Sequence, residues 1–573
     1  MRLHQGRNFQ WAAVAIFLLT CFGGLSGPTA ARESSSTCPT RPAAGSLVGE
    51  PEDLHSAHGV LRVDLSYRMS LSHDGETHYC YVSAAGKEAP TLRVRPGDLL
   101  VLRLKNMEPE AARPNIPAAH QHAAAHGCTS GTMSPTATNL HFHGLTVPPV
   151  CHQDDVLNTL IQAGDQPFEY RLRIPANEPP GLYWYHPHVH GVTKTQVLGG
   201  ASGALIVEGV ESTIPALAGL AERVFIIRDR ELVNPDAAPI QTDSMPPPMV
   251  MRDAEGDILN TGTGGGKPAK DLSINFVSVP FPSYPPALIQ LRPGEHQLWR
   301  ILNASAITYL DLQLLVENQL QALGVVSLDG VPVSERGAAA NRILWQSHAL
   351  VPPAGRIEII VKGPAEGKKA SLVTRTVDTG PAGENDPTRP LATVIGTPRA
   401  AEPQAHLVAK PKPLPTPGPP WLGSVQPVRT RRLYFSEQPH DPTDPRSPTD
   451  FFITVEGQQP RLFDPDSATA AIVARQGDVE DWIIENRTQE LHAFHIHQLH
   501  FMLLDWNGIP LDEPFLRDTI NVGYWDGKSP DYPSVRLRMD FRSVNVVGTF
   551  VYHCHLLEHE DGGMMGLIRV EPR

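Results

Sequence analysis

Gly548-Thr-Phe-Val-Tyr-His-Cys-His-Leu-Leu-Glu-His-Glu-Asp-Gly-Gly-Met-Met565 stands near the carboxyl-terminal end of the 573-residue chain. Within it, Cys554 is flanked by His553 and His555, and His559 follows five residues after the cysteine. Successive side chains of a strand point to opposite faces, so both flanking histidines point away from Cys554. One short strand can therefore hold a metal on one side and contact a second metal centre on the other.

The ligand types in this stretch suit one class of metal site. A cysteine, histidines and a weak methionine ligand are what a blue, type 1 copper site needs. Met564, ten residues after the cysteine, fits the methionine position, with Met565 as the alternative. A structural zinc site prefers several cysteines or a closed set of four ligands, so zinc fits less well.

Three further segments carry the pattern His-x-His. They are residues 141–143, 186–188 and 495–497. In an extended segment both rings of such a pair project to one face, where they can bind or bridge metals. One pair alone would suit ordinary surface or core histidines, but with His553 and His555 the four pairs supply eight imidazoles. That number suits a cluster of three coppers. His492 lies three residues before the pair at 495–497 and can reach the type 1 copper instead.

These four segments resemble the multicopper oxidases, the family of laccases, bilirubin oxidases, ferroxidases and bacterial cuprous oxidases. The similarity extends over most of the chain after the leader and implies four copper ions. The implied type 1 ligands are His492, Cys554, His559 and Met564, the type 2 ligands are His141 and His495, and the ligands of the type 3 pair are His143, His186, His188, His497, His553 and His555. The family usually has His-Pro where this chain has His492-Ala493. Because proline is not a ligand, we expect only a local backbone difference.

The resemblance also implies two acids that supply protons for the reduction of O2. Glu560 directly follows His559, and Asp154 lies eleven residues after His143. Asp155 is the alternative to Asp154, and a solvated surface carboxylate is the alternative role for each acid.

Residues 1–31 have the features of a secretory signal peptide. An apolar stretch from Trp11 to about Leu25 follows a short basic region, and small residues mark a cleavage site near Ala30 or Ala31. The apolar run is short for a membrane span of about 20 residues, which disfavours an uncleaved anchor. Cys21 leaves lipoprotein processing open. We therefore expect a secreted or periplasmic protein, exported by the general secretory route.

The cysteines fit an exported protein. They are Cys21, Cys38, Cys80, Cys128, Cys151 and Cys554. Without the leader and the copper thiolate four remain, which favours two disulfides, although some could stay free thiols. We prefer the pair Cys128–Cys151, which would brace the loop around His141 and His143, with Cys38–Cys80 as the other pair.

A repeated segment predicts three domains of one kind. The copies are residues 95–106, 292–303 and 475–486. Each begins Arg-x-Gly-acid, continues with an apolar-rich segment and ends in Asn, which indicates a turn followed by a strand. A second correspondence, between residues 181–188 and 548–555, joins the first and last copies.

Short alternating strands between Gly and Pro turns predict an all-β chain of Greek-key sandwiches or barrels. The resemblance makes them three cupredoxin-like domains. We expect a first domain at 32–210, a second at 211–400, a Pro-rich linker at 401–421 and a third at 422–573. The outer domains must meet, because each brings four of the eight imidazoles. The second domain has few histidines and is predicted to be a spacer and pocket wall.

The predicted function is that of a laccase-type oxidase. It would take electrons one at a time from phenols or aromatic amines, through an exposed edge of His492 or His559, and reduce O2 to two waters. The alternatives are a metal oxidase for Cu(I) or Fe(II) in copper tolerance, and a non-catalytic copper-binding or electron-transfer protein. Three His-x-His clusters beyond the blue site argue against the last.

The net charge of −13, without a basic block, argues against nucleic acid as a partner. We expect a monomer.

Overall fold

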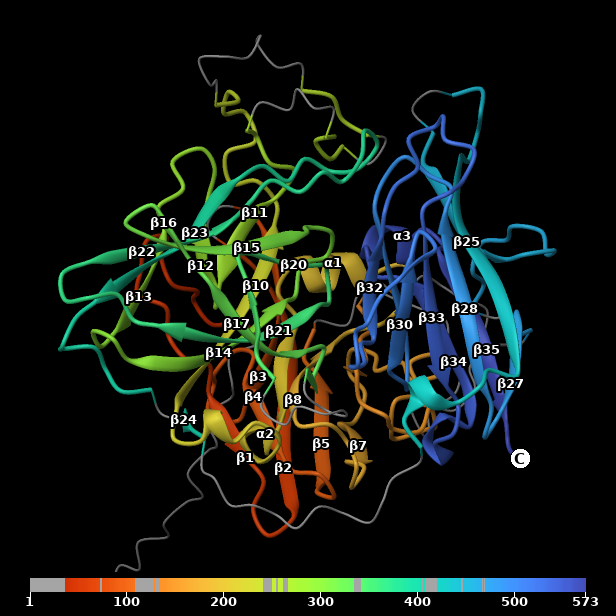
Figure 1. The fold of residues 1–573 in the computed structure, drawn as a ribbon, viewed down its shortest axis with the longest axis horizontal. Coiled ribbons are helices and arrows are strands. Elements are labelled where there is room, and N and C mark those ends of the chain that lie inside the picture. Colours follow the sequence, from red (N-terminus) through yellow and green to blue (C-terminus); the bar gives the residue numbers. More distant parts are fainter. Residues whose placement is uncertain are drawn as a thin grey trace, which may run out of the picture. The chain divides into compact units, whose positions relative to one another are not determined.

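The computed structural model describes residues 37–573, with gaps at 73–74, 109–127, 129–133, 135, 241–249, 254–255, 261–265, 334–341, 404, 408–419, 445–446, 466 and 468. The predicted signal peptide and most of the predicted linker lie outside the described residues. In this part of the chain the α-helices are short: α1 (Thr193–Leu198), α2 (Val210–Thr213) and α3 (Leu557–Asp561). No helix in it is long and apolar enough to cross a membrane. Strands make up most of the regular structure, which confirms the all-β class (Figure 1).

The first pair of sheets is built from residues 53–207. One sheet has the order β1-β4-β9-β8-β6 and the other the order β3-β2-β5-β7. The strands are β1 (Asp53–His55), β2 (Val60–Leu71), β3 (Thr77–Ser83), β4 (Thr91–Val94), β5 (Leu99–Asn106), β6 (His141–His143), β7 (Phe168–Arg173), β8 (Gly181–His186) and β9 (Gly203–Val207). Leu92 and Val94 of one sheet share a buried apolar cluster with Leu100 and Leu102 of the other, so the two sheets enclose one core.

The second pair uses residues 221–406. The larger sheet has the order β12-β11-β10-β14-β21-β17-β18, with β19 beside β17 and β24 beside β10; the smaller has the order β13-β23-β22-β15-β16, with β20 beside β15. The strands are β10 (Ala221–Arg230), β11 (Asp271–Ile274), β12 (Val277–Val279), β13 (Ala287–Leu291), β14 (His296–Asn303), β15 (Leu310–Val316), β16 (Gln319–Gln321), β17 (Leu323–Leu328), β18 (Val331–Pro332), β19 (Leu344–Gln346), β20 (Ala349–Val351), β21 (Arg356–Lys362), β22 (Lys369–Thr374), β23 (Arg389–Gly396) and β24 (Ala405–His406). Trp299 of the larger sheet and Leu372 of the smaller belong to its core.

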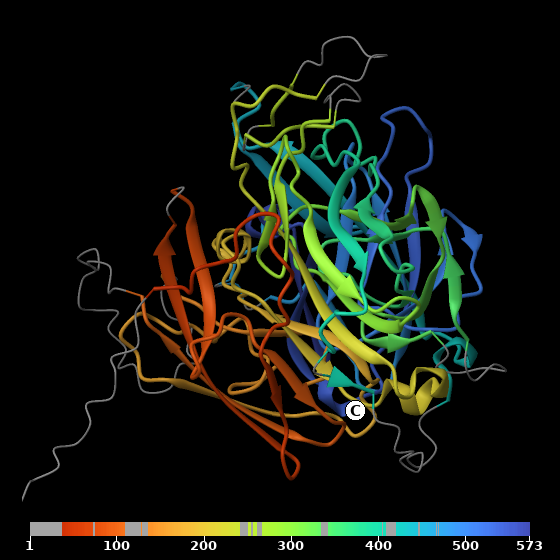
Figure 2. The same cartoon turned by 90° about the vertical axis from the view of Figure 1, so that its left-hand side faces the viewer.

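The third pair uses residues 429–571, drawn in cyan to blue in Figures 1 and 2. Its sheets have the orders β26-β25-β28-β33-β30-β31 and β27-β35-β34-β29-β32. The strands are β25 (Arg429–Pro439), β26 (Thr449–Val455), β27 (Ile472–Arg475), β28 (Val479–Asn486), β29 (His492–Ile496), β30 (Phe501–Trp506), β31 (Ile509–Pro510), β32 (Thr519–Val522), β33 (Ser534–Asp540), β34 (Gly548–Cys554) and β35 (Met565–Glu571). Trp482 and Leu537 of one sheet pack with Tyr552 and Ile568 of the other in one core.

The repeated segment occupies the same position in each pair of sheets. Its strand is β5, β14 or β28, and each pairs in parallel with the first long strand of its sheet, β2, β10 or β25. The glycines of the preceding turn, Gly97, Gly294 and Gly477, have φ values of 89°, 71° and 99°. This left-handed conformation favours glycine, because a Cβ atom is strained there. The repeat therefore marks a turn whose backbone requires glycine.

The asparagine that ends each copy has one role throughout. Asn106, Asn303 and Asn486 each donate from Nδ2 to two backbone carbonyls of neighbouring segments. The side-chain oxygen of each accepts from the backbone N–H two residues later. Buried backbone groups need partners where a strand leaves its sheet. This one side chain supplies three of them, which explains why it recurs in all three copies.

The second correspondence between the outer copies also has a packing cause. β8 pairs with β9 in the first sheet pair as β34 pairs with β35 in the third. A Cβ on Gly203 would lie 2.2 Å from Oη of Tyr185, and one on Gly566 would lie 2.5 Å from the Tyr552 ring. Each strand after the histidine strand thus has a glycine as its first or second residue because a tyrosine ring lies across it.

The second sheet pair extends beyond the limits expected from the sequence. Leu47, within the expected first domain, forms a bridge with Leu288 of β13. β24, within the expected linker, pairs with β10. Segments on both sides of the second sheet pair are therefore bound to it by backbone hydrogen bonds.

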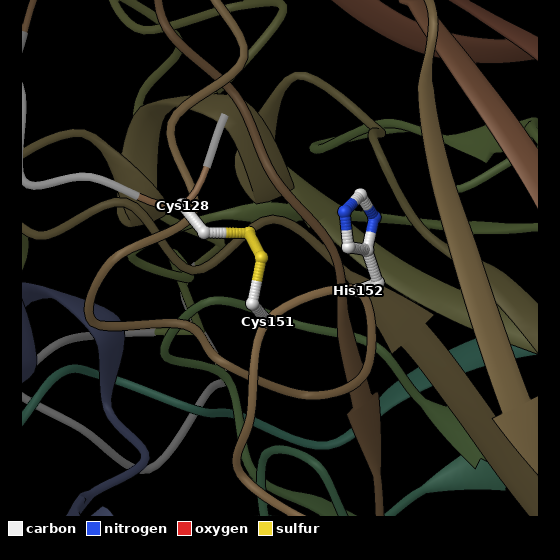
Figure 3. A group of neighbouring side chains, drawn as sticks. All are labelled: Cys128, Cys151 and His152. Atoms are coloured by element: carbon white, nitrogen blue, oxygen red, sulfur yellow. A yellow bond between two sulfur atoms is a disulfide. The ribbon is translucent and has the colours of Figure 1, made fainter. Parts of the chain in front are cut away.

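Both preferred disulfides are confirmed. Cys38 and Cys80 are bonded with a Cα–Cα distance of 5.8 Å, and Cys128 and Cys151 with one of 5.6 Å. The ring of His152 lies beside the second disulfide (Figure 3). These sulfurs are not available as thiolates, so this group does not qualify as a metal site. Of the cysteines in the described residues, Cys554 is free and buried.

Candidate metal centres

Four strands bring the eight histidines of the His-x-His pairs together. β6 and β8 of the first sheet pair are neighbours, with His141 opposite His186. β29 and β34 of the third sheet pair are neighbours in the same way, with His495 opposite His553. The two strand pairs correspond in the internal repeat, so each outer sheet pair supplies an equivalent half of the cluster.

The two halves of the histidine cluster face each other, and their His-x-His pairs run in opposite directions. The His141 ring stacks on His497 with centroids 3.7 Å apart, and the His143 ring stacks on His495 with centroids 3.8 Å apart. His188 and His553 have centroids 5.1 Å apart, and His186 and His555 have centroids 5.4 Å apart. In each case the first histidine of one pair meets the second of another. The site therefore has approximate two-fold symmetry and requires both outer sheet pairs.

Hydrogen bonds on one nitrogen of a ring leave the other nitrogen free. Nδ1 of His141 lies 3.0 Å from Asp154, Nδ1 of His186 lies 2.8 Å from a backbone oxygen, and Nδ1 of His495 lies 2.8 Å from another. Nε2 of these three rings is buried without a hydrogen-bond partner. A buried polar atom without a partner costs about 1–3 kcal/mol. A metal ion would satisfy these nitrogens, and the partners on Nδ1 would fix the rings toward it.

The protonation of the eight rings also suits a metal. All eight are buried, and burial, which disfavours the imidazolium form, is the main cause that lowers the pKa of each. The pKa of His186 falls to about 3 and that of His553 to about 4. Neutral imidazole is the form that binds a metal, so the cluster is ready for ligation at ordinary pH.

The opposite face of β34 carries a second, smaller group. Sγ of Cys554 lies 3.5 Å from Nδ1 of His492 and 3.7 Å from Nδ1 of His559, and the two nitrogens are 3.1 Å apart. Met564 packs in the same buried cluster as Cys554, whereas Met565 belongs to a separate cluster. A cysteine with two histidine nitrogens and a methionine nearby is the donor set that suits copper.

The outer edges of these two histidines are covered by carboxylates. Nε2 of His492 lies 3.3 Å from Glu437 and 2.9 Å from Oγ1 of Thr488, and Nε2 of His559 lies 3.2 Å from Glu490. His492 is 0% exposed and His559 is 2% exposed. The expectation that one of these rings has an exposed edge is therefore wrong. Glu437 of β25 and Glu490 of the loop before β29 pack over them, which the ligand motif cannot indicate.

The two candidate proton-supplying acids lie beside the cluster of eight. Asp154 is buried, accepts from the backbone N–H of Phe142 at 2.9 Å and lies beside His141. Burial raises its pKa to about 7. Asp155 instead binds Asn158 on the surface. Of the two neighbours, Asp154 therefore has the placement of a proton donor.

Glu560 lies on α3 and contacts the cluster of eight histidines. Its carboxylate oxygens are 3.3 Å from Nδ1 of His553 and 3.7 Å from Nδ1 of His188. Burial raises its pKa well above the ordinary range of a glutamate. A buried carboxyl that holds its proton near neutral pH can deliver it to a reaction at the cluster.

Several residues around the centres were not found from the sequence. Glu437 and Glu490 are not part of any recognisable motif. They contact His492 and His559 from a neighbouring strand and a loop. Gln498 donates to Asp154 at 2.5 Å, and its position directly after a His-x-His pair is a weak signal. Asp518, 3.1 Å from Nε2 of His143, lies far along the chain from that histidine, and nothing in the pattern of residues indicates the contact.

Family models described as multicopper oxidase match residues 131–212 and 442–573. These ranges contain all the candidate ligands. A multicopper oxidase of Staphylococcus haemolyticus is 25% identical over 441 residues, which cover 76% of each chain. A laccase of Bacillus subtilis is 22% identical over 512 residues, covering 83% of this chain and 87% of that one.

Solved structures share the fold. A multicopper oxidase of Campylobacter jejuni, described as a metallo-oxidase, has a TM-score of 0.62 and 24% sequence identity, and the match covers 93% of this chain and 96% of that one. A laccase-like oxidase of an Ochrobactrum species has a TM-score of 0.58 at 22% identity, covering 91% and 100% of the two chains. The sheet pairs are therefore cupredoxin-like, as expected.

Proposed function

This chain belongs to the multicopper oxidase family, and we propose that it is an exported enzyme coupling four one-electron oxidations of a donor to the reduction of O2 to two waters. The single observation that carries the proposal is β34, whose Cys554 faces one candidate centre while His553 and His555 face the other. Two centres joined through one backbone segment suit the transfer of electrons from a donor to O2.

Four copper ions fit the donor atoms. We assign the type 1 copper to His492, Cys554, His559 and Met564, and the type 2 copper to His141 and His495. The type 3 pair is assigned to His143, His186, His188, His497, His553 and His555. The chemistry that the coppers supply when bound is electron transfer and O2 reduction. The protein holds the ligands at fixed positions, keeps them neutral and supplies protons from Asp154 and Glu560.

We further propose that the chain is exported and acts as three domains. The disulfides Cys38–Cys80 and Cys128–Cys151 support export, because disulfides persist in oxidising compartments. Residues 32–210 and 422–573 would form the copper domains. Residues 211–400 would form the second domain, to which β24 and the segment around Leu47 attach.

We propose phenols and aromatic amines as the donor class, as in the laccases among the relatives. The test is O2 uptake by the copper-loaded protein, with a phenol, Cu(I) or Fe(II) as the donor. Uptake with a phenol at a rate well above that with either metal ion supports the laccase assignment. Absence of uptake with every donor, in protein that shows the blue absorption, would contradict an oxidase of any kind.

A metal-ion donor is the second candidate, and one observation favours it. The only partners of the outer edges of both type 1 histidines, among the described residues, are Thr488 and the carboxylates of Glu437 and Glu490. The Glu437 side chain is 20% exposed, so a cation could approach it from solvent. The Glu437 carboxylate, in contact with the electron-accepting His492, would attract Cu(I) or Fe(II) and hold it within reach of electron transfer.

Replacing Glu437 distinguishes a metal-ion donor from a phenol donor. If a metal ion is the donor, Glu437→Gln should raise the KM for that ion about 10-fold, because one negative charge near a cation contributes on the order of 1–2 kcal/mol. The kcat/KM for a neutral phenol should change by less than about threefold. Glu456→Gln, on an exposed glutamate of the same sheet pair, is the matched control. Equal effects of Glu437→Gln on both donors would count against a cation site.

A further inference from the structure

One arginine of the second sheet pair reaches the cluster of eight histidines. Arg356 is the first residue of β21 and is fully buried. Its Nη1 donates to Oδ1 of Asp518 at 2.7 Å and its Nη2 to Oδ2 of Asp518 at 2.5 Å. Asp518 belongs to the third sheet pair, directly before β32. Two parallel hydrogen bonds between a guanidinium and a carboxylate fix the orientation of the carboxylate.

The same arginine also contacts the first sheet pair. Its Nε donates to the backbone oxygen of Leu182 on β8 at 3.2 Å. A Cβ on Gly144, directly after His143, would lie 2.5 Å from Nη2 of Arg356 and 2.6 Å from Oδ2 of Asp518. The ion pair therefore packs against the backbone next to a candidate ligand, and the side chain of Arg356 joins all three sheet pairs.

Asp518 in turn orients two candidate ligands. Its Oδ1 lies 3.1 Å from Nε2 of His143, and its backbone oxygen lies 2.8 Å from Nδ1 of His495. The other ring nitrogens, Nδ1 of His143 and Nε2 of His495, are buried without hydrogen-bond partners. These are the atoms left to bind copper. The rings of the two histidines stack with centroids 3.8 Å apart, so a rotation of one disturbs the other.

We propose that Arg356 is a positioning residue of the three-copper cluster, which acts by holding Asp518 in the position from which its carboxylate aims His143, and its backbone oxygen aims His495, at the metals. The second sheet pair, without copper ligands of its own, thereby controls the placement of His143, which is assigned to the type 3 pair, and of His495, which is assigned to the type 2 copper. The inference rests on the proposed assignment of these histidines to copper. Partners of this kind typically affect metal affinity 10–100-fold.

The test compares Arg356→Met and Arg356→Lys with the wild type. The measurements are copper per chain, the electron paramagnetic resonance signal of type 2 copper, and the blue absorption. For Arg356→Met we expect about 10–100-fold weaker retention of type 2 copper and a changed type 2 signal, with the blue absorption unchanged. Arg356→Lys keeps the charge but not the two-pronged contact, so it should fall between, and it keeps the proposal testable if the methionine variant does not fold.

A matched control is available in Arg300→Met. Arg300 is equally buried and paired with Glu222 and Glu358, all within the second sheet pair and away from the histidines. The double variant Arg356→Met with Asp518→Asn removes the unpaired charge of Asp518 but not the loss of the arginine that fixes this side chain, so its type 2 signal should stay as changed as that of Arg356→Met. Type 2 copper in Arg356→Met no weaker than in Arg300→Met, or recovery of the wild-type type 2 signal in the double variant, would overturn the inference. Wild-type protein without type 2 and type 3 signals would instead overturn the proposed function.

Discussion

Cys554→Ser is expected to abolish both the blue absorption and turnover while the trinuclear coppers stay bound. Serine is close in size to cysteine, so the substitution should not change the packing around this fully buried position. The serine hydroxyl is a poor ligand for copper, whereas the cysteine thiolate is a soft ligand that copper prefers. In the proposed function the electron path from His492 and His559 to the cluster also runs through this residue. We expect O2 uptake to fall by at least about 1,000-fold, equivalent to about 4 kcal/mol.

Three measurements check this expectation together. Copper per chain should fall by one ion, the blue absorption should disappear, and the type 2 signal should keep its wild-type form. The control is the double variant Cys38→Ser with Cys80→Ser, which removes a disulfide away from the centres and should keep the blue absorption. Loss of all copper from Cys554→Ser would contradict the division of ligands between the two faces of β34.

The candidate ligands could be predicted from the sequence because their chemistry is local. A His-x-His pair in a strand presents both rings on one face whatever the fold around it. His553 and Cys554 are adjacent, so the alternation of a strand alone separates their centres. The residues that recur between the copies are also explained by local packing, such as the close contact of Gly203 with Tyr185. Such signals depend on a few neighbouring residues, and one sequence contains them.

The residues that support the ligands could not be predicted in this way. Arg356 and Asp518 lie on different sheet pairs, and each would suit an ordinary ion pair. Their role depends on how the three sheet pairs pack, which no local pattern encodes. The same holds for Glu437, whose contact with His492 corrects the expected exposed edge. Sequence indicates what binds the metal, and packing decides what orients the ligands and what reaches them.

The approximate two-fold symmetry of the cluster explains why neither half suffices. The rings of His141 and His497 stack at 3.7 Å, and each comes from a different copy of the repeat. With both copies in contact, ring nitrogens such as Nε2 of His141 are buried without a hydrogen-bond partner, at a cost of about 1–3 kcal/mol for each. Metal ions bound by both copies would remove that cost. The site is therefore also part of what holds the outer sheet pairs together.

Glu560→Gln is expected to slow turnover without changing the copper sites. Glutamine keeps the size of the side chain and stays polar, but it cannot donate and regain a proton at neutral pH. Glu560 is fully buried and lies 3.3 Å from Nδ1 of His553, so few other acids can take its place. Loss of a general acid typically costs about 100–10,000-fold in rate. The kcat for O2 reduction should fall within this range.

The decisive comparison separates proton delivery from electron delivery. Reduction of the type 1 copper by the donor in the absence of O2 should keep its wild-type rate, because His492 and His559 are unchanged. Reoxidation by O2 should be slow. Glu558→Gln is the control on the same helix, since its carboxylate pairs with Lys194 and not with the cluster histidines. If Glu560→Gln and Glu558→Gln reoxidise equally fast, Glu560 supplies no proton, and Asp154 beside His141 becomes the acid to test by the same comparison with Asp154→Asn.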